Sequence, residues 1–191
     1  MIIGITGGTG CGKTTLLNYI REAGGLVLDC DAIYHELLQT DRKMLSAIDA
    51  RFPGTVENGV LNRKKLGSLV FSDENALLDL NRITHSAVKK EVLRRLAQQP
   101  KLAAIDAIGL FEGGLSELCD VTVAVTAPMD QRVQRLMARD GISEDYARNR
   151  IAAQKTEEWF RTRCDAVLEN SGDLESYSMK CLDFLKGLGI M

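Results

Sequence analysis

The sequence predicts an α/β fold in which a parallel sheet is flanked by helices. Short apolar runs recur along the chain as candidate strands, and segments with helical spacing of apolar residues lie between them. The candidate strands are residues 2–6, 26–29, 102–105, 121–126 and 166–168. Strands that alternate with helices imply right-handed crossovers, and therefore a parallel sheet with helices on both faces. The order of the strands in the sheet does not follow from the sequence.

The first strand, 2–6, runs directly into Gly7-Gly8-Thr9-Gly10-Cys11-Gly12-Lys13-Thr14, which matches G-x-x-x-x-G-K-[ST] in full. Glycines permit the backbone angles that turn successive N–H groups inward as an anion cradle, and the helix expected to begin near Lys13 adds its positive end. We expect Lys13 on the β- and γ-phosphates and the Thr14 hydroxyl on Mg²⁺. Further contacts to the nucleotide are expected from Gly10, Cys11, Gly12 and Thr15. A glycine-rich turn without a ligand is the alternative, and the agreement of strand, loop and helix disfavours it.

The helix after this loop carries Leu16, Leu17 and Ile20 and is expected to end at Gly24-Gly25. Two later segments are too long to be simple crossovers. Residues 31–99 have a mostly helical pattern, which predicts a helical subdomain that covers a second substrate. Residues 130–163 combine basic residues with short helices. We find no repeat or linker, so a single domain is expected.

Composition excludes several classes of function. The 191 residues carry a net charge of −2, so no overall basic field points to nucleic acid or to a membrane surface. The five cysteines include no C-x-x-C pair and only two histidines are present, so no metal-site spacing occurs. No apolar run approaches the ~20 residues that span a bilayer, and the first strand leaves no room for a targeting segment. We therefore expect a cytoplasmic protein with reduced cysteines, no nucleic-acid or membrane partner, and a monomeric or weakly homo-oligomeric state.

Two carboxylates, Asp29 and Asp31, follow the second candidate strand. Ligands of open α/β sheets bind beyond the carboxyl ends of the strands, the edge where the phosphate-binding loop also lies. A carboxylate there can orient a substrate hydroxyl toward the γ-phosphate and accept its proton. The alternative is that Asp31 caps a helix over 32–38. We favour the functional interpretation for Asp31 but not for Asp29.

Asp106 ends another candidate strand and opens the short D-x-x-G pattern Asp106-Ala107-Ile108-Gly109. At that sheet edge it can orient Mg²⁺ through water, and a turn or capping aspartate is the equally weighted alternative. No asparagine in the chain is followed by lysine, so the Asn-Lys-x-Asp stretch with which GTPases recognise guanine is absent. This absence argues against a GTPase switch.

Arginines recur on one helix face after the strand 121–126. Arg132, Arg135 and Arg139 are spaced i, i+3 and i+7, and Arg148 and Arg150 follow on the next expected helix. The planar guanidinium suits phosphate clamping, so beside a phosphate-binding loop these residues predict a mobile lid that excludes water. A solvated face paired with nearby acids is the alternative, and we expect it for most of them. Arg139 is the arginine to which we assign a catalytic role.

The ordered set of motifs resembles the dephospho-CoA kinase family along nearly the whole chain. The segment from Gly4 to Thr15 is similar to the family's G-L-T-G-G-I-G-S-G-K-S-T, and Leu28-Asp29-Cys30-Asp31 to its I-D-A-D. Further similar stretches are Asn58-Gly59-Val60-Leu61-Asn62-Arg63 with Val70-Phe71, Ile83-Thr84-His85, Leu110-Phe111-Glu112, Arg135-Leu136-Met137-Ala138-Arg139-Asp140, Gln154 and Asn170-Ser171-Gly172.

The resemblance implies a nucleotide-kinase-like P-loop NTPase fold: one domain over 1–191, with a helical substrate-binding insertion at about 31–99 and an arginine-rich lid at about 130–150. It implies that ATP, with Mg²⁺, phosphorylates the ribose 3′-hydroxyl of dephospho-CoA to give CoA and ADP, the last step of coenzyme A biosynthesis. Asp31 is then the catalytic base, helped by Lys13 and Arg139. Substrate contacts are expected from Asp31, Arg63 and His85, although a hydrogen-bonded structural histidine is the alternative for His85.

The chain departs from the family pattern in a few places. Ser86 replaces the proline that usually follows the histidine, and Ile108-Gly109 stands where Pro-Leu is common. Cys11 and Thr14 replace serines, and Thr14 keeps the hydroxyl that Mg²⁺ needs. Two other functions remain open at this point: a small-molecule kinase with another acceptor, such as a nucleoside, nucleotide or sugar, and a nucleotide-dependent switch or assembly ATPase.

Overall fold

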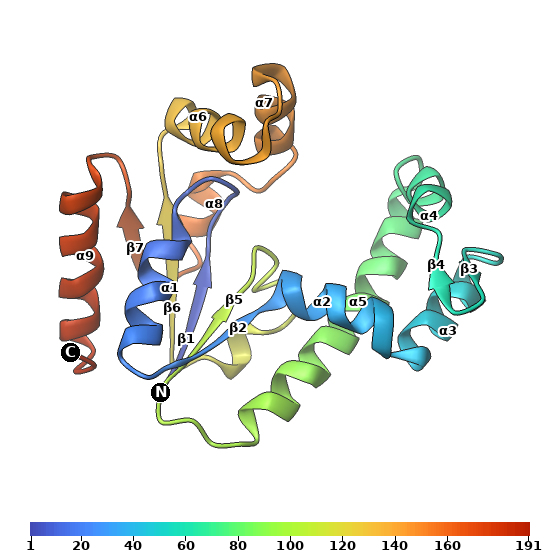
Figure 1. Cartoon of the computed structure of the whole chain (residues 1–191), viewed down its shortest axis with the longest axis horizontal. Coiled ribbons are helices and arrows are strands. Elements are labelled where there is room, and N and C mark those ends of the chain that lie inside the picture. The colour runs from blue at the N-terminus through green and yellow to red at the C-terminus, as the bar shows by residue number, and fades with distance from the viewer. The chain divides into compact units, whose positions relative to one another are not determined.

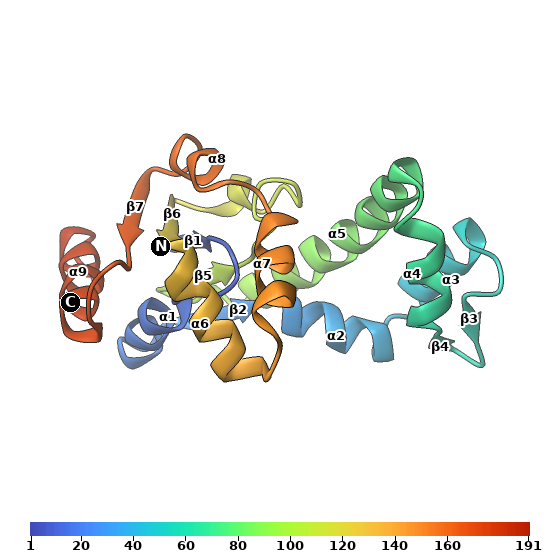
Figure 2. The same ribbon diagram turned by 90° about the horizontal axis from the view of Figure 1, so that it is seen from above.

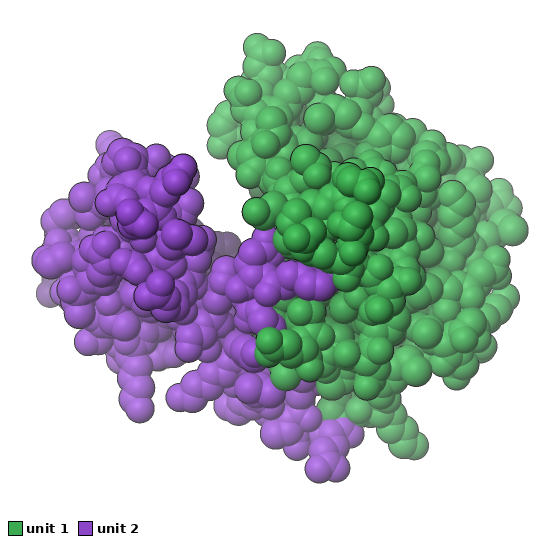
Figure 3. Space-filling view, turned by 180° about the vertical axis from the view of Figure 1, so that it is seen from behind, with its two compact units in different colours: residues 1–28, 100–110, 115–191 green, residues 29–99, 111–114 purple.

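The computed structural model describes residues 1–191, which divide into two compact units, coloured separately in Figure 3. Unit 1 comprises Met1–Leu28, Pro100–Leu110 and Leu115–Met191, and unit 2 comprises Asp29–Gln99 and Phe111–Gly114. The elements, labelled in Figure 1, are β1 (Ile2–Thr6), α1 (Lys13–Glu22), β2 (Leu26–Asp29), α2 (Cys30–Thr40), α3 (Arg42–Arg51), β3 (Val56–Glu57), β4 (Val60–Leu61), α4 (Arg63–Val70), α5 (Glu74–Leu96), β5 (Ala103–Asp106), a 3₁₀ turn (Ser116–Leu118), β6 (Val121–Thr126), α6 (Met129–Asp140), α7 (Glu144–Ala152), α8 (Glu157–Arg161), β7 (Ala166–Glu169) and α9 (Leu174–Gly187).

A five-stranded sheet in the order β2-β5-β1-β6-β7 forms the centre of unit 1. β1 pairs in parallel with β5 on one side and with β6 on the other, and β6 pairs in parallel with β7. The predicted parallel sheet flanked by helices is therefore confirmed, and each predicted strand begins and ends within one residue of its prediction. The strand order is new information, because it is decided by contacts between segments far apart in the sequence.

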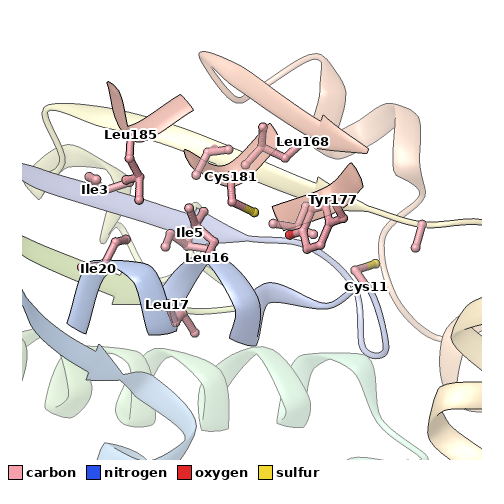
Figure 4. Close-up of a cluster of buried hydrophobic side chains, with 14 of the residues drawn as sticks. Ile3, Ile5, Cys11, Leu16, Leu17, Ile20, Leu168, Tyr177, Cys181 and Leu185 are labelled. Atoms are coloured by element: carbon pink, nitrogen blue, oxygen red, sulfur yellow. The ribbon is translucent and has the colours of Figure 1, made fainter. Parts of the chain in front are cut away.

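Side-chain alternation along β1 explains how helices attach to this sheet. Ile3 and Ile5 are fully buried in a cluster with Leu16 of α1 and Leu185 of α9, so these two helices cover one face (Figure 4). Gly4 points to the other face, where an added Cβ would lie 2.9 Å from Leu110 Cδ2 and 2.8 Å from the sulfur of Cys119. Burying each large apolar side chain contributes about 1.5–3 kcal/mol. The core thus fixes the strand that leads into the phosphate-binding loop.

Unit 2 contains the four helices α2 to α5 and the short antiparallel hairpin β3–β4. Side-chain caps define where its helices begin: Asp41 caps α3, Asn62 caps α4 and Asp73 caps α5. The mostly helical character predicted for 31–99 is therefore confirmed. Its role as a substrate-binding insertion stays a prediction.

No helix of this structure combines the length and the apolar character that crossing a membrane requires. All five cysteines are free thiols, and Cys11, Cys30 and Cys181 are buried.

Candidate active site

The phosphate-binding loop, residues 7–14, joins β1 to α1. Gly12 is the residue before α1 and has φ 93°, a left-handed conformation that favours glycine. A Cβ on Gly12 would also collide with the side-chain amide of Asn170. The predicted helix start at Lys13 is confirmed. The loop therefore delivers its backbone to the positive end of α1, as an anion cradle requires.

Lys13 and Asp106 meet at the carboxyl edge of the sheet. Lys13 Nζ donates a hydrogen bond of 3.1 Å to the carbonyl oxygen of Gly7 and lies 3.8 Å from Asp106 Oδ1. The side chains of Lys13 and Asp106 are only 15% and 17% exposed. Asp106 reaches this position because β5 pairs with β1 and places it opposite Ile5. An amine held this way is positioned to exchange the Gly7 carbonyl for phosphate oxygens.

The residues at this edge fit the donor chemistry of Mg²⁺. The Thr14 side chain lies in the exposed first turn of α1, and the Asp106 carboxylate ends the neighbouring strand β5. Both offer oxygen, the ligand atom that Mg²⁺ prefers, and Mg²⁺ binds with one or two protein ligands plus phosphate oxygens and water. Unit 1 thus supplies the oxygen donors for a MgATP site of this kind.

Two arginines of α6, Arg132 and Arg135, contact the carbonyl oxygens of the loop, a contact that the sequence did not predict. Arg132 Nε donates to the carbonyl oxygen of Thr9 at 2.9 Å. Arg135 Nη1 donates to the carbonyl oxygens of Gly10 and Cys11 at 3.2 and 3.4 Å. Figure 1 shows α6, which carries both arginines, beyond the ends of the strands on the side of the loop that leads into α1. Figure 2 shows the same region from above. The loop backbone is therefore held by side chains of α6.

The other arginines of α6 and α7 pair with acids. Arg139 Nε lies 2.7 Å from Asp140 Oδ1, and its side chain is 60% exposed. Asp140 also pairs with Arg150 at 2.8 Å. We expected most of these arginines to lie on an exposed face and to pair with acids. Arg139 and Arg150 do so. The catalytic role of Arg139 stays a prediction.

Three polar side chains outside the loop complete its surroundings. Gln154 Oε1 accepts from the Thr9 N–H at 2.8 Å, Asn170 Nδ2 donates to the Cys11 carbonyl at 2.9 Å, and the Tyr177 hydroxyl donates to the Gly12 carbonyl at 3.3 Å. The family resemblance includes Gln154 and Asn170 but gives them no role, and the similar stretches do not include Tyr177. Their contacts depend on long-range packing, so no local pattern signals them.

Cys11 lies within the loop and is only 3% exposed. Burial raises the pKa of its thiol, although the nearby cations of Arg132 and Lys13 act in the opposite direction. The neutral thiol therefore dominates at neutral pH, and the residue contributes to the site through its backbone.

In unit 2, the structure separates the roles of the two aspartates at the start of α2. Asp29 is the N-cap, since its Oδ1 accepts from the Ala32 N–H at 2.9 Å. The alternative that Asp31 caps this helix is therefore wrong. Asp31 lies in the first turn of α2, and its side chain is exposed. Its role as catalytic base stays a prediction.

Arg63 and His85, the other expected substrate contacts, both lie in unit 2. Arg63 begins α4 and is exposed, and its Nη2 is 3.1 Å from Nδ1 of His35. A guanidinium only donates, so His35 accepts through Nδ1 and carries its proton on Nε2. His85 is half-buried on α5. The Arg63–His35 contact was not predicted, because it joins two helices 28 residues apart.

Comparison with known proteins identifies the family. The family model described as dephospho-CoA kinase matches residues 1–176. The dephospho-CoA kinase of Anaeromyxobacter dehalogenans is 38% identical over 185 residues, covering 94% of this chain and 88% of that protein. That of Bacillus licheniformis is 34% identical over 181 residues, covering 92% and 90%.

Solved structures agree. The Thermus thermophilus protein TT1252 superposes with a TM-score of 0.81 at 36% identity, over 98% of this chain and 97% of that one. The dephospho-CoA kinase of Campylobacter jejuni (TM-score 0.69, 23% identity, 100% and 98% coverage) and the shikimate kinase of Bacteroides thetaiotaomicron (TM-score 0.57, 17% identity, 99% and 98%) share the fold. With this sheet, this loop and these relatives, the chain belongs to the dephospho-CoA kinase family.

Proposed function

We propose that this chain transfers the γ-phosphoryl group of MgATP to the ribose 3′-hydroxyl of dephospho-CoA, giving CoA and ADP as the last step of coenzyme A biosynthesis. The observation that carries the proposal is the family match over residues 1–176, in a chain that retains Lys13 and Thr14 of the phosphate-binding motif. The proposal includes a cytoplasmic location, because free thiols suit a reducing compartment. It also includes a monomeric or weakly associating enzyme.

The reaction requires positioning and charge neutralisation, since the phosphoryl group passes through a loose transition state. The loop amides and Lys13 bind the phosphates, and Thr14, with Asp106 acting through water, holds Mg²⁺. When bound, Mg²⁺ neutralises charge on the β- and γ-phosphate oxygens. Arg139 adds positive charge from the lid and excludes water on closure.

On the acceptor side, Asp31 orients the 3′-hydroxyl and accepts its proton. Arg63 and His85 contact the acceptor, and the helices of unit 2 bind the CoA moiety. The contacts available at Lys13 and Asp106 support the phosphate half of this scheme, and the family match supports the acceptor half.

ADP release from MgATP, measured with and without dephospho-CoA, tests the proposal. Strong stimulation with a product that carries a new 3′-phosphate is the expected result. Nucleotide binding without stimulation would overturn the acceptor assignment, and a panel of nucleoside, nucleotide and sugar acceptors would then identify the true one. Hydrolysis that responds to a protein partner and to no small acceptor would favour an assembly ATPase instead.

A further inference from the structure

Three consecutive carbonyl oxygens of the phosphate-binding loop accept hydrogen bonds from side chains outside it. The bonds are Arg135 Nη1 to Gly10 O (3.2 Å), Asn170 Nδ2 to Cys11 O (2.9 Å) and Tyr177 Oη to Gly12 O (3.3 Å). The donors come from α6, from the residue after β7, and from α9. Three separate elements of unit 1 thus hold one short stretch of backbone.

Holding a carbonyl also aims an amide. In a trans peptide the C=O of one residue and the N–H of the next share a plane and point in opposite directions, and the chain contains no cis bond. The bond to Cys11 O therefore directs the Gly12 N–H, and the bond to Gly12 O directs the Lys13 N–H, away from the supporting side chains. Both N–H groups stand at the start of α1, where a helix supplies no internal acceptor and its dipole favours an anion.

The bond to Gly10 O has a different consequence. The amide in that plane, the N–H of Cys11, donates back to Gly8 O at 3.3 Å within the loop. Arg135 therefore stabilises the turn of the loop, and its longer contact of 3.4 Å to Cys11 O supports the same carbonyl as Asn170 does. Its second function is to orient Asn170, because Arg135 Nη2 donates to Asn170 Oδ1 at 3.2 Å.

Asn170 is buried, with 6% of its surface exposed. Its backbone N–H donates to the backbone carbonyl of Thr126 in β6 at 2.8 Å. Its amide orientation follows from its neighbours: the guanidinium only donates, so Oδ1 faces Arg135 and the NH₂ group faces the Cys11 carbonyl. The side chain is thus fixed to the sheet at one end and to the loop at the other.

Tyr177 is equally constrained. It is 1% exposed within the core cluster that includes Leu168 and Cys181, and Figure 4 shows it close to Cys11. Burial raises the pKa of its hydroxyl, so the group remains a hydrogen-bond donor throughout the neutral range.

We propose that Asn170 and Tyr177 are positioning residues that preorganise the phosphate cradle by fixing the peptide planes that carry the Gly12 and Lys13 N–H groups. The ligand class they serve is the polyphosphate chain itself, independent of the base. The inference rests on the proposed function only in that the loop binds a nucleoside triphosphate. Without these bonds, the two N–H groups sample orientations that a bound phosphate must first correct, which lowers affinity.

The test uses Tyr177→Phe, which removes one oxygen and keeps the shape, and Asn170→Ala, which removes the central amide. Lys180→Ala is the matched control, because Lys180 lies on the same helix as Tyr177 and donates to Glu169 O at 2.9 Å instead of to the loop. Each protein is titrated by calorimetry with magnesium tripolyphosphate, which has no base, and with MgADP. Loss of one hydrogen bond predicts an affinity about 2- to 10-fold weaker for both ligands in the two variants, and unchanged in the control.

A variant that weakens MgADP but leaves tripolyphosphate binding intact would show that the residue contacts the base, and would overturn the inference. Unchanged affinity for both ligands in Tyr177→Phe would overturn it as well. Hydrogen exchange gives an independent readout: with saturating magnesium tripolyphosphate, the amides of residues 12 and 13 should be less protected in the variants than in the control. A wild-type protein that binds both ligands yet leaves dephospho-CoA unphosphorylated would overturn the proposed function and not this inference.

Discussion

The backbone N–H of Thr9 donates a 2.8 Å hydrogen bond to Oε1 of Gln154, a residue that follows α7 and lies 145 positions further along the chain. The same Oε1 accepts from Arg132 Nη2 at 3.1 Å, and Arg132 Nε holds the Thr9 carbonyl at 2.9 Å. The N–H and the C=O of Thr9 are thus both hydrogen-bonded, the first to Gln154 and the second to Arg132 of α6. Because Thr9 is only 7% exposed, water cannot easily replace these partners.

Gln154→Ala should therefore destabilise the protein. It leaves the Thr9 N–H buried without its acceptor, which costs about 1–3 kcal/mol in the free energy of unfolding. Gln154→Glu is the matched control, since it keeps an acceptor for Thr9 and places a carboxylate beside Arg132. Urea denaturation compares the two. Equal loss in both variants would mean that the acceptor for the Thr9 N–H does not account for the loss, because Gln154→Glu keeps that acceptor.

Lys13→Ala should abolish turnover of MgATP with dephospho-CoA. The amine at Lys13 is the only charge that the loop contributes to the phosphates, and its removal would also take a positive charge from beside Asp106, 3.8 Å away. Steady-state ADP release measures the effect, and circular dichroism checks that the fold is kept. Measurable turnover at more than a few per cent of the wild-type rate would contradict the role given to Lys13.

Asp31→Asn should lower kcat about 10²-fold or more, because an amide cannot accept the proton of the 3′-hydroxyl. Asp29→Asn offers a matched control at the other aspartate of the same turn. Asparagine caps helices as well as aspartate does, so that variant should keep both its stability and its rate. A near-normal rate in Asp31→Asn would remove the general-base role, and a large loss in Asp29→Asn would move that role to Asp29.

Arg139→Ala should lower kcat about 10²-fold, the loss expected when one donor to transition-state charge is removed. Arg148→Ala is the comparison, because Arg148 is also an exposed lid arginine paired with acids, Glu144 at 2.9 Å and Asp130 at 3.0 Å. A surface ion pair contributes little to stability, so neither variant should change the unfolding midpoint much. Equal rates for the two variants would show that Arg139 has only its ion pair with Asp140.

Glu91 should make the stability of the chain depend on pH in the acid range. Hydrogen bonds from Arg94 and Arg95 lower its pKa from 4.5 to about 2. A pKa that is lower in the folded state adds stability above pH 4.5, and this contribution is lost as pH falls from 4.5 toward 2. Glu91→Gln should therefore unfold at lower urea than the wild type at pH 7, and the difference should shrink steadily below pH 4.5. A difference independent of pH would contradict the ionic origin.

Local sequence patterns were enough to predict the parallel α/β class, the start of α1 at Lys13 and the bounds of each strand to within one residue. These patterns are apolar runs, glycine conformations and helix-stop signals. It also supplied the motif set that the family match supports. The tertiary structure was needed to show that Asp29 rather than Asp31 caps α2. Both residues are aspartates at the start of the helix, so either could cap it. The choice depends on where the chain leaves β2.

The tertiary structure likewise decided which arginines hold the phosphate-binding loop. Arg132, Arg135 and Arg139 share one spacing and one chemistry, so periodicity cannot rank them. Arg132 and Arg135 contact the loop carbonyls, whereas Arg139, at the end of α6, meets Asp140. Side-chain hydrogen bonds between segments more than 100 residues apart depend on the packing of whole elements, and no local sequence signal encodes that packing.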